Sequence, residues 1–401
     1  MYGHLLDERR LRNAWKKVKQ NDGAGGVDKV TIGMFECQLD LQLKTLMRQL
    51  QEKTYRPQPV RRVPIEKEGS NKVRNLGIPT IRDRVVQQAL KDLLEPIFDP
   101  HFSPRSYGYR PGHSQHGALG EVKVFREHFD WVLDADIKGF FDNVDHEVLL
   151  DLVNERVSDG SILNLIRMFL ESDVYFDGLV HPTDTGTPQG GVISPLLANI
   201  YLNHLDRQLS EEDIFFVRYA DDLVVFCENR ADAEATLRLI REILENDLHV
   251  ELSVEKTKIV YLRYEVDENG VVHPDYGPFE YLGFRISRSG MSPCARSIKK
   301  FKDTIRGLTI RHRTYETTWW IQTLNSKIRG WCNYFGYGRV KVLFRNLSQW
   351  IRDRVRLNLG SRRKWGVRYN IRWLTPLRLE HYPNSVLREM GLITPEDLLD
   401  S

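Results

Sequence analysis

The sequence predicts an α+β protein, in which a mixed region with antiparallel strands is followed by an all-helical region. Two pairs of apolar, β-rich segments flank short polar turns at residues 61–79 and 215–227, as in β-hairpins. From about residue 296 to 357 the apolar side chains recur at helical spacing. No internal repeat or low-complexity tract points instead to a solenoid or a disordered chain.

The first half of the chain alternates between helices and strands. Residues 1–50 are expected to be helical, apart from a glycine-rich turn at 21–28. After the hairpin at 61–79, a helix is expected from Arg82 to Leu94, with Pro96 ending it. The alternating segment 131–137 predicts a half-buried strand.

The second half begins with a helix near 146–157 and the hairpin at 215–227. A helix at about 231–246 and short strands between 250 and 286 are expected to follow, before the helical region. The last thirty residues contain three prolines, and we expect a short, partly ordered tail there.

The composition is typical of a soluble globular protein. Of the 401 residues, 41% are hydrophobic and 28% are charged, and the mean hydropathy is −0.44. No apolar run reaches the roughly 18 residues that a membrane span needs. The four cysteines are far apart, so neither a disulfide framework nor a cysteine zinc site is expected. We therefore expect an intracellular protein without a membrane association.

The charge is divided unequally along the chain. Residues 285–372 contain 22 Lys and Arg against three acids, an excess of 19 positive charges, whereas the whole chain carries only +3. Such an excess repels itself unless a polyanion is bound, and cations that neutralise phosphates release counterions. A solvated charged face is the ordinary alternative, but the size of the excess favours nucleic-acid binding.

Adjacent acids at the tip of an apolar hairpin indicate a metal site. Asp221 and Asp222 lie between two β-rich arms, where two like charges repel each other. Mg²⁺ removes that repulsion, because it prefers one or two carboxylates together with phosphate oxygens. A third acid is expected from the strand at 131–137, where Asp134 and Asp136 share one face. The spacing alone does not choose between Asp134 and Asp136.

Blocks of sequence resemble the reverse transcriptases encoded by group II introns, in that family's order. YADD at 219–222 resembles the catalytic box, and SYGYRPG at 106–112 resembles a block characteristic of the intron enzymes. The resemblance extends from about residue 20 to 357. Further matching blocks are RNLGIPTIRDRVVQQAL (74–90), LDADIKGFFDNVDH (133–146), GTPQGGVISPLLANIYLNHLD (186–206), LSVEKTKIVYL (252–262), FEYLGFRI (279–286) and IRGWCNYFGYG (328–338).

The resemblance implies a right-hand polymerase fold, with fingers and palm followed by a helical thumb. It selects Asp136 rather than Asp134, and it places two Mg²⁺ ions, with Mn²⁺ as a substitute, on Asp136, Ile137, Asp221 and Asp222. Asp136, Asp221 and Asp222 are the expected catalytic residues.

The resemblance also implies contacts to the incoming nucleotide and to the primer. The nucleotide-binding residues that it implies are Lys67, Arg74, Phe141, Gln189 and Lys256, and the primer-grip residues are Tyr281 and Gly283. Phe141 is expected to exclude a ribose 2′-hydroxyl, with its neighbour Phe140 as the alternative. Lys67 could equally be an exposed loop cation, and Lys256 could form a simple surface pair with Lys258.

In the thumb, the recurrence of Ile328, Trp331, Tyr334 and Phe335 indicates an amphipathic helix, so these side chains are assigned to the core. The expected RNA contacts are basic residues, with Arg352 and Arg356 on one face at i, i+4 spacing. The full RNA-binding set is Arg329, Arg339, Lys341, Arg345, Arg352, Arg354 and Arg356.

Four regions follow from this interpretation: an N-terminal helical extension at 1–50, fingers and palm at 51–290, a basic thumb or maturase domain at 291–360, and a short tail at 361–401. His381 is the only His or Cys after residue 360, so no endonuclease metal site is expected there.

The expected function is an RNA-directed DNA polymerase that is also a maturase, promoting splicing and mobility by target-primed reverse transcription. Its expected partners are group II intron RNA, an RNA template, a DNA primer, target DNA and dNTPs, in a bacterial cytoplasm and at the nucleoid. Two alternatives remain. One is a host reverse transcriptase in defence or DNA repair, and the other is a non-enzymatic RNA-binding splicing factor, against which the intact acids argue.

Overall fold

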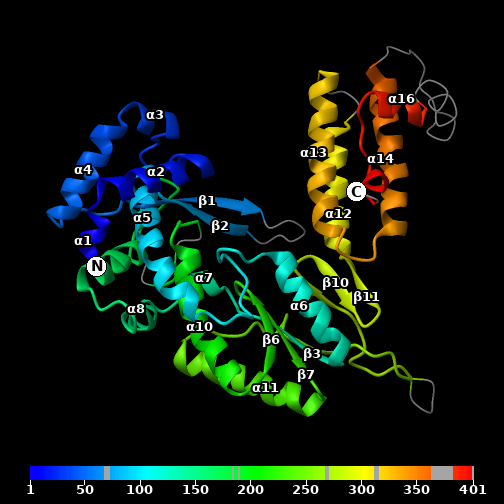
Figure 1. Cartoon of the computed structure of the whole chain (residues 1–401), viewed down its shortest axis with the longest axis horizontal. Helices are drawn as coiled ribbons and strands as arrows, with labels where there is room; N and C mark the ends of the chain where they lie inside the picture. Colours follow the sequence, from blue (N-terminus) through cyan, green and yellow to red (C-terminus); the bar gives the residue numbers. More distant parts are fainter. Residues whose placement is uncertain are drawn as a thin grey trace. The chain divides into compact units, whose positions relative to one another are not determined.

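The computed structural model describes residues 1–66, 73–182, 185–187, 190–266, 271–310, 316–362 and 383–399. The chain divides into two compact units, residues 1–276 and 277–401 (Figure 1). Each unit has a hydrophobic core of its own.

The N-terminal region is helical, as predicted. Its helices are α1 (Tyr2–Leu5), α2 (Glu8–Asn21), α3 (Ile32–Cys37) and α4 (Leu39–Gln51). The Asp7 side chain caps α2 by accepting a hydrogen bond from the Arg9 amide. Leu11, Trp15 and Val18 then fall on one buried face, and Trp15 stacks on Phe35 with a centroid distance of 4.9 Å.

The first sheet contains the predicted hairpin at 61–79. Strands β1 (Val60–Glu66) and β2 (Val73–Ile78) pair antiparallel. On its other edge β1 pairs parallel with β4 (Val174–Phe176), which pairs with β5 (Leu179–His181). Strands β4 and β5 were not among the predicted elements, because strands of three residues give almost no periodic pattern in the sequence.

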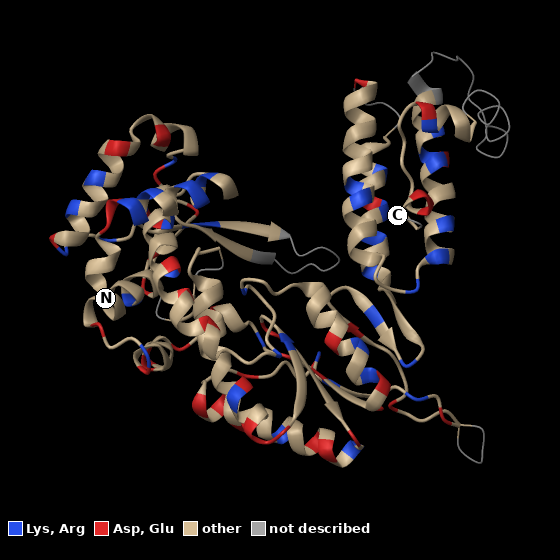
Figure 2. Cartoon of the chain, viewed as in Figure 1, with Lys and Arg blue, Asp and Glu red and all other residues tan. Residues whose placement is uncertain are grey.

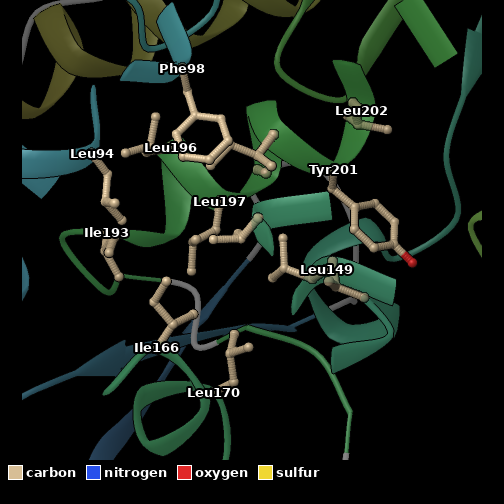
Figure 3. Close-up of a cluster of buried hydrophobic side chains, with 14 of the residues drawn as sticks. Leu94, Phe98, Leu149, Ile166, Leu170, Ile193, Leu196, Leu197, Tyr201 and Leu202 are labelled. Atoms are coloured by element: carbon tan, nitrogen blue, oxygen red, sulfur yellow. The ribbon is translucent and has the colours of Figure 1, made fainter. Parts of the chain in front are cut away.

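Two long helices form the centre of the first unit. They are α5 (Ile81–Phe98) and α10 (Ser194–Glu211). The prediction that Pro96 ends the first of these was wrong, because α5 continues to Phe98 with Pro96 inside its last turn. Figure 3 shows Leu94 and Phe98 of α5 beside Leu196 and Leu197 of α10, all of them buried.

Shorter helices complete this part of the unit. They are η1 (Asp99–His101), α6 (Gln115–His128), α7 (Phe140–Asn143), α8 (His146–Asn154) and α9 (Gly160–Leu170). Helices α8 and α9 add Leu149, Ile166 and Leu170 to the cluster in Figure 3.

The palm sheet has the strand order β6-β7-β3-β8, and every neighbouring pair is antiparallel. Its strands are β6 (Phe215–Tyr219), β7 (Asp222–Cys227), β3 (Trp131–Asp136) and β8 (Lys258–Tyr261). Helix α11 (Arg230–Glu242) packs against β3, β7 and β8 and continues as η2 (Ile243–Asp247). The hairpin predicted at 215–227 and the strand predicted at 131–137 are confirmed. The expected strand near 252 is a single bridge between Ile137 and Leu252.

The second unit begins with a three-stranded antiparallel sheet, β9 (Phe279–Tyr281), β10 (Phe284–Ser287) and β11 (Gly290–Pro293). The helices α12 (Ala295–Leu308), α13 (Thr317–Phe335) and α14 (Lys341–Arg362) follow. Ile328 and Phe335 are buried, and Trp331 stacks on Phe301 with a centroid distance of 4.5 Å. The assignment to the core is confirmed for Ile328 and Phe335, while Trp331 and Tyr334 are partly buried.

Residues 383–399, expected as part of a short tail, are packed into this second unit. They include α16 (Asn384–Glu389) and η4 (Pro395–Leu398). Leu387 and Leu392 lie in the core that α13 and α14 form. The Asn325 side-chain amide donates to the Gly391 carbonyl, and the Ser348 hydroxyl accepts from the Glu396 amide. This segment is part of the helical fold.

Within the part of the chain that the structure describes, no helix combines the length and apolar character needed to cross a bilayer.

Candidate active site

The YADD segment is the turn between β6 and β7. Tyr219 and Asp222 are register partners, so Ala220 and Asp221 are the two central residues of a tight hairpin. Ala220 has a φ of 57°, in the left-handed region that residues with a Cβ rarely adopt. The sequence therefore makes the two acids adjacent at a constrained turn, at the end of the palm sheet.

The third acid lies directly across from this turn. Asp136 is the last residue of β3, and it is the register partner of Asp222 in the antiparallel β3–β7 pair. Asp134 pairs with Val224 instead, two residues further along the strands. The strand register thus brings Asp136, rather than Asp134, beside the adjacent acids.

The gathered charges perturb Asp222. Although Asp222 is exposed as a residue, protein atoms crowd its carboxyl group and partly desolvate it. That desolvation and the negative charges of Asp221, Asp136 and Asp134 raise the pKa of Asp222 to about 7. A carboxyl group with such a pKa gains from a nearby cation.

Lysine side chains provide positive charge at this edge of the sheet. The Lys256 ammonium lies 2.7 Å from Oδ1 of Asp136, and Lys258 lies 3.5 Å from Asp134. Among the described residues, no group of three or more His, Cys, Asp and Glu side chains is arranged as a metal site.

The turn is supported by a buried arginine that the sequence analysis missed. Arg218 is the β6 residue before Tyr219, and its side chain is fully buried. Its guanidinium group pairs with Asp206 of α10 and also donates to the Ala220 carbonyl. The available signal was a charged residue inside the apolar arm FFVRY.

Comparison with known families agrees with this geometry. A model described as "Reverse transcriptase (RNA-dependent DNA polymerase)" matches residues 65–286, more than half of the chain, and these residues include all three acids. The chain belongs to the reverse transcriptase family. A second model, "Group II intron, maturase-specific domain", matches residues 298–374. The enzyme is thus an RNA-directed DNA polymerase of the group II intron type with a maturase domain.

Two curated relatives are similar in sequence to this chain over most of their own length. The Group II intron-encoded protein LtrA of Lactococcus lactis subsp. cremoris is 29% identical over 84% of this chain and 70% of its own length. Protein YkfC of Escherichia coli (strain K12) is 34% identical over 59% of this chain and 72% of its own length. A solved chain from a partial Cas6-RT-Cas1--Cas2 complex is 23% identical over 61% of this chain, with a TM-score of 0.39, and the match spans 42% of that chain.

The structure describes only some of the residues that the family resemblance assigns to nucleotide binding in this reverse transcriptase. Lys67 and Gln189 lie outside the described residues, and Arg74 is described only as the β2 partner of Ile65. Ile137 is buried and its hydrocarbon side chain has no donor atom, so its part in the expected metal site falls to its main-chain carbonyl.

Phe140 and Phe141 both lie in α7 and belong to the buried core. Phe141 is 8% exposed and Phe140 is 2% exposed, and the Phe140 ring contacts Tyr201. The assignment of the 2′-hydroxyl barrier to Phe141 stays a prediction.

The primer-grip candidates lie in the second unit. Tyr281 ends β9 and is buried, and Gly283 lies in the turn before β10 with a φ of 80°. The Gly283 carbonyl accepts hydrogen bonds from the Cys294 amide and the Ser297 hydroxyl. Glycine is required here by the backbone conformation, while the contact to a primer stays a prediction.

The basic residues expected to bind RNA fall into two groups. Arg329, Arg339, Lys341 and Arg345 are exposed. Arg354 is partly exposed and donates to the Thr309 hydroxyl at 3.0 Å. Figure 2 shows Lys and Arg distributed along α12, α13 and α14.

The expectation that Arg352 and Arg356 present a shared RNA-binding face was wrong. Arg352 is 8% exposed and donates to Thr394, and Arg356 is 2% exposed and donates to Asn384. Both partners belong to the packed segment 383–399, which covers the face that the i, i+4 spacing creates. These two arginines hold that segment in place.

Proposed function

We propose that this reverse transcriptase is encoded by a group II intron, copies that intron's RNA from a DNA primer, and binds the same RNA to promote its splicing. The observation that carries the polymerase activity is the register that sets Asp136 opposite Asp222, the neighbour of Asp221 in the turn. The basic maturase-type helices carry the RNA-binding part.

Asp136, Asp221 and Asp222 would hold two Mg²⁺ ions, with the main chain at Ile137 as a further ligand. The chemical type of these ligands suits the metal, because Mg²⁺ prefers carboxylate oxygens. A cation would also relieve the repulsion between the acids, which contributes to the raised pKa of Asp222. When bound, such a pair activates a 3′-hydroxyl and stabilises the departing pyrophosphate. Asp136 would exchange its ion pair with Lys256 for this role, which frees the lysine for the nucleotide phosphates.

The first sheet supports a nucleotide-binding role for the fingers hairpin. Lys67 and Arg74 belong to the β1–β2 hairpin and its connection, and two cations there would neutralise a triphosphate. The main chain of Gly190, next to Gln189, approaches β2 so closely that a Cβ at Gly190 would lie 2.2 Å from the Gly77 carbonyl oxygen. Only glycine permits this approach, which brings the main chain of Gly190 to the hairpin.

The intron role is favoured over a defence or repair role by the maturase-specific domain. Exposed cations on α13 and α14 would contact phosphates and read the shape of a folded RNA rather than its base sequence. Target DNA would then supply the primer from which the same active site copies the intron RNA.

Primer extension tests the polymerase activity. The full chain is incubated with an RNA template, an annealed DNA primer, dNTPs and Mg²⁺, beside the variant Asp221→Ala/Asp222→Ala. The variant should lose extension while keeping its RNA affinity within about twofold, because the acids bind metal rather than RNA. Equal loss of both would contradict the division of roles.

A splicing assay tests the maturase activity. The precursor RNA that contains the flanking intron is incubated with and without the protein at low Mg²⁺, where splicing depends on protein support. Acceleration by the wild-type chain and by the Asp221→Ala/Asp222→Ala variant alike is expected. Failure of both to accelerate splicing would remove the intron role and leave the polymerase.

A further inference from the structure

We infer that Arg218 is a positioning residue for the catalytic turn, acting with Asp206 and Asn199 through the Ala220 carbonyl. The inference deepens the proposed polymerase function and rests on it. The Arg218 side chain bonds to Asp206, Asn199 and the Ala220 carbonyl. It would act by fixing the backbone from which Asp221 and Asp222 project.

The Arg218 side chain makes four hydrogen bonds in a fully buried environment. Its Nε and Nη2 donate to the two carboxylate oxygens of Asp206, with Nε 2.7 Å from Oδ1. Its Nη1 donates to the Ala220 carbonyl at 2.8 Å and to Oδ1 of Asn199 at 3.1 Å. The side chains of Arg218 and Asp206 are both 0% exposed. The fixed planar fork of a guanidinium group permits all four bonds at once, and a lysine ammonium does not.

A buried ion pair is poor evidence for a stabilising role. Desolvating both charges is costly, and well-packed apolar residues often serve stability equally well. The Arg218–Asp206 pair lies under the one hairpin whose conformation matters for the acids. Its placement therefore indicates a specific geometric task.

That task is visible at Ala220. A residue with a Cβ in the left-handed region is strained, and such strain persists only where the surroundings determine the conformation. The Arg218 guanidinium holds the Ala220 carbonyl two residues along the chain. Because Asp221 follows Ala220 directly, the orientation of this peptide sets where both carboxylates point.

The SYGYRPG segment holds the same turn from a second direction. The Tyr107 amide donates to the Arg218 carbonyl, and the Arg218 amide donates to the Arg105 carbonyl, both at 2.9 Å. A Cβ at Gly108 would lie 2.3 Å from the Ala220 nitrogen, so the two backbones are in direct contact. Asn199 joins the two supports, because its amide donates to the Gly108 carbonyl at 2.8 Å.

Two variants separate positioning from general stability. Arg218→Lys keeps a charge opposite Asp206 but cannot make the bonds to Ala220 and Asn199 together. Asn199→Ala removes the bonds from Arg218 to Asn199 and from Asn199 to Gly108, and it leaves the Arg218–Asp206 pair intact. The matched control is Tyr55→Phe, which removes a buried hydrogen bond from the Tyr55 hydroxyl to Asp83 at 2.6 Å, in the same unit and away from the turn.

The measurements are kcat for primer extension, the Mg²⁺ concentration for half-maximal rate, template–primer affinity, Mn²⁺ binding to the protein alone, and the melting temperature. Arg218→Lys should lower kcat on the order of a hundredfold, because an ångström-scale misplacement of reacting groups costs about that much. Asn199→Ala should lower kcat about tenfold. Both should weaken Mn²⁺ binding and raise the Mg²⁺ requirement, with template–primer affinity unchanged. Tyr55→Phe should keep kcat and the Mg²⁺ requirement within about twofold of wild type.

The inference is overturned if both variants behave like Tyr55→Phe, with kcat following the melting temperature and Mn²⁺ binding unchanged. A wild-type chain that extends no primer would instead refute the proposed function. Mn²⁺ binding then still decides the positioning role, because it needs no nucleic acid. If Arg218→Lys does not fold, Asn199→Ala tests the inference through kcat for primer extension and through Mn²⁺ binding.

Discussion

Lys256 and Asp136, which are 120 positions apart in the chain, form an ion pair at the edge of the palm sheet, with the ammonium nitrogen 2.7 Å from Oδ1. Both side chains remain partly exposed. The lysine thus occupies the coordination space of an acid that the polymerase reaction would need for metal. A metal ion and Lys256 would compete for the same carboxylate.

Lys256→Ala should therefore lower the Mg²⁺ concentration for half-maximal primer extension. Removing one competing charge near a solvent-exposed carboxylate is worth about 1 kcal/mol, or roughly fivefold in concentration. The KM for dNTPs should rise in the same variant if the lysine contacts the triphosphate. A Mg²⁺ titration at saturating and subsaturating dNTP measures both effects.

Lys258→Ala is the matched control for this experiment, because Lys258 pairs with Asp134 on the same strand face at 3.5 Å. It should change the Mg²⁺ requirement less than twofold. A higher Mg²⁺ requirement in Lys256→Ala would show that the lysine supports the metal site instead of competing with it.

Asp222→Asn should stabilise the metal-free protein at pH 8. The folded-state pKa of Asp222 is raised from 3.8 to about 7, so between these values the folded protein binds more protons than the unfolded chain. Stability contributed by this group is therefore lost as pH rises from about 4 to 7, and it stays lost above 7. Melting temperatures in EDTA should favour the variant at pH 8 and converge with wild type at pH 4.

Mg²⁺ provides the control for the pH experiment. Mg²⁺ that binds the wild-type carboxylates stabilises the folded state by mass action. Added Mg²⁺ should therefore reduce the difference in melting temperature between Asp222→Asn and wild type at pH 8. A variant no more stable than wild type in EDTA at pH 8 would contradict the repulsion among the four acids of this edge.

Local sequence patterns were sufficient for the elements that carry periodic side chains. The hairpin at 215–227 and the helices after residue 296 follow from alternation and from helical spacing. The position of the metal acids did not follow from spacing, because Asp134 and Asp136 share a face. The choice of Asp136 came from resemblance, and the β3–β7 register supplies its physical reason.

Contacts distant in sequence explain what the patterns missed. Arg218 occurs in an apolar arm, and its acidic partner Asp206 lies on another element, α10. Nothing local marks the two as a buried pair. Similarly, the spacing of Arg352 and Arg356 correctly places them on one helix face. That face is covered by Thr394 and Asn384, which lie in a later segment of the chain.

Gly108→Ala should impair extension by at least about tenfold, because the added Cβ would lie 2.3 Å from the Ala220 nitrogen and backbone must move. The displaced backbone belongs to the turn that presents the acids. Gly160→Ala is the control, since a Cβ at Gly160 meets nothing within 4 Å and the residue begins a helix in the same unit. Equal activity of the two variants would show that the turn tolerates the displacement.

Neutralising exposed cations of the thumb should weaken RNA binding without destabilising the fold. Arg329→Ala/Arg345→Ala removes one exposed charge from α13 and one from α14. Each lost phosphate contact should reduce the slope of log affinity against log salt by about one. Filter binding of the intron RNA between low and moderate salt measures the slope, and the melting temperature should stay unchanged.

Arg352→Ala is the opposite case, because this arginine is buried against Thr394 and Glu396 rather than open to a ligand. Removing it leaves Thr394 and Glu396 without that partner and loosens segment 383–399, which should destabilise the second unit by about 1–3 kcal/mol. Its salt slope should match wild type at temperatures where the variant is folded. A reduced slope in Arg352→Ala at an unchanged melting temperature would restore this residue to the RNA-binding surface and show that segment 383–399 leaves it when RNA binds.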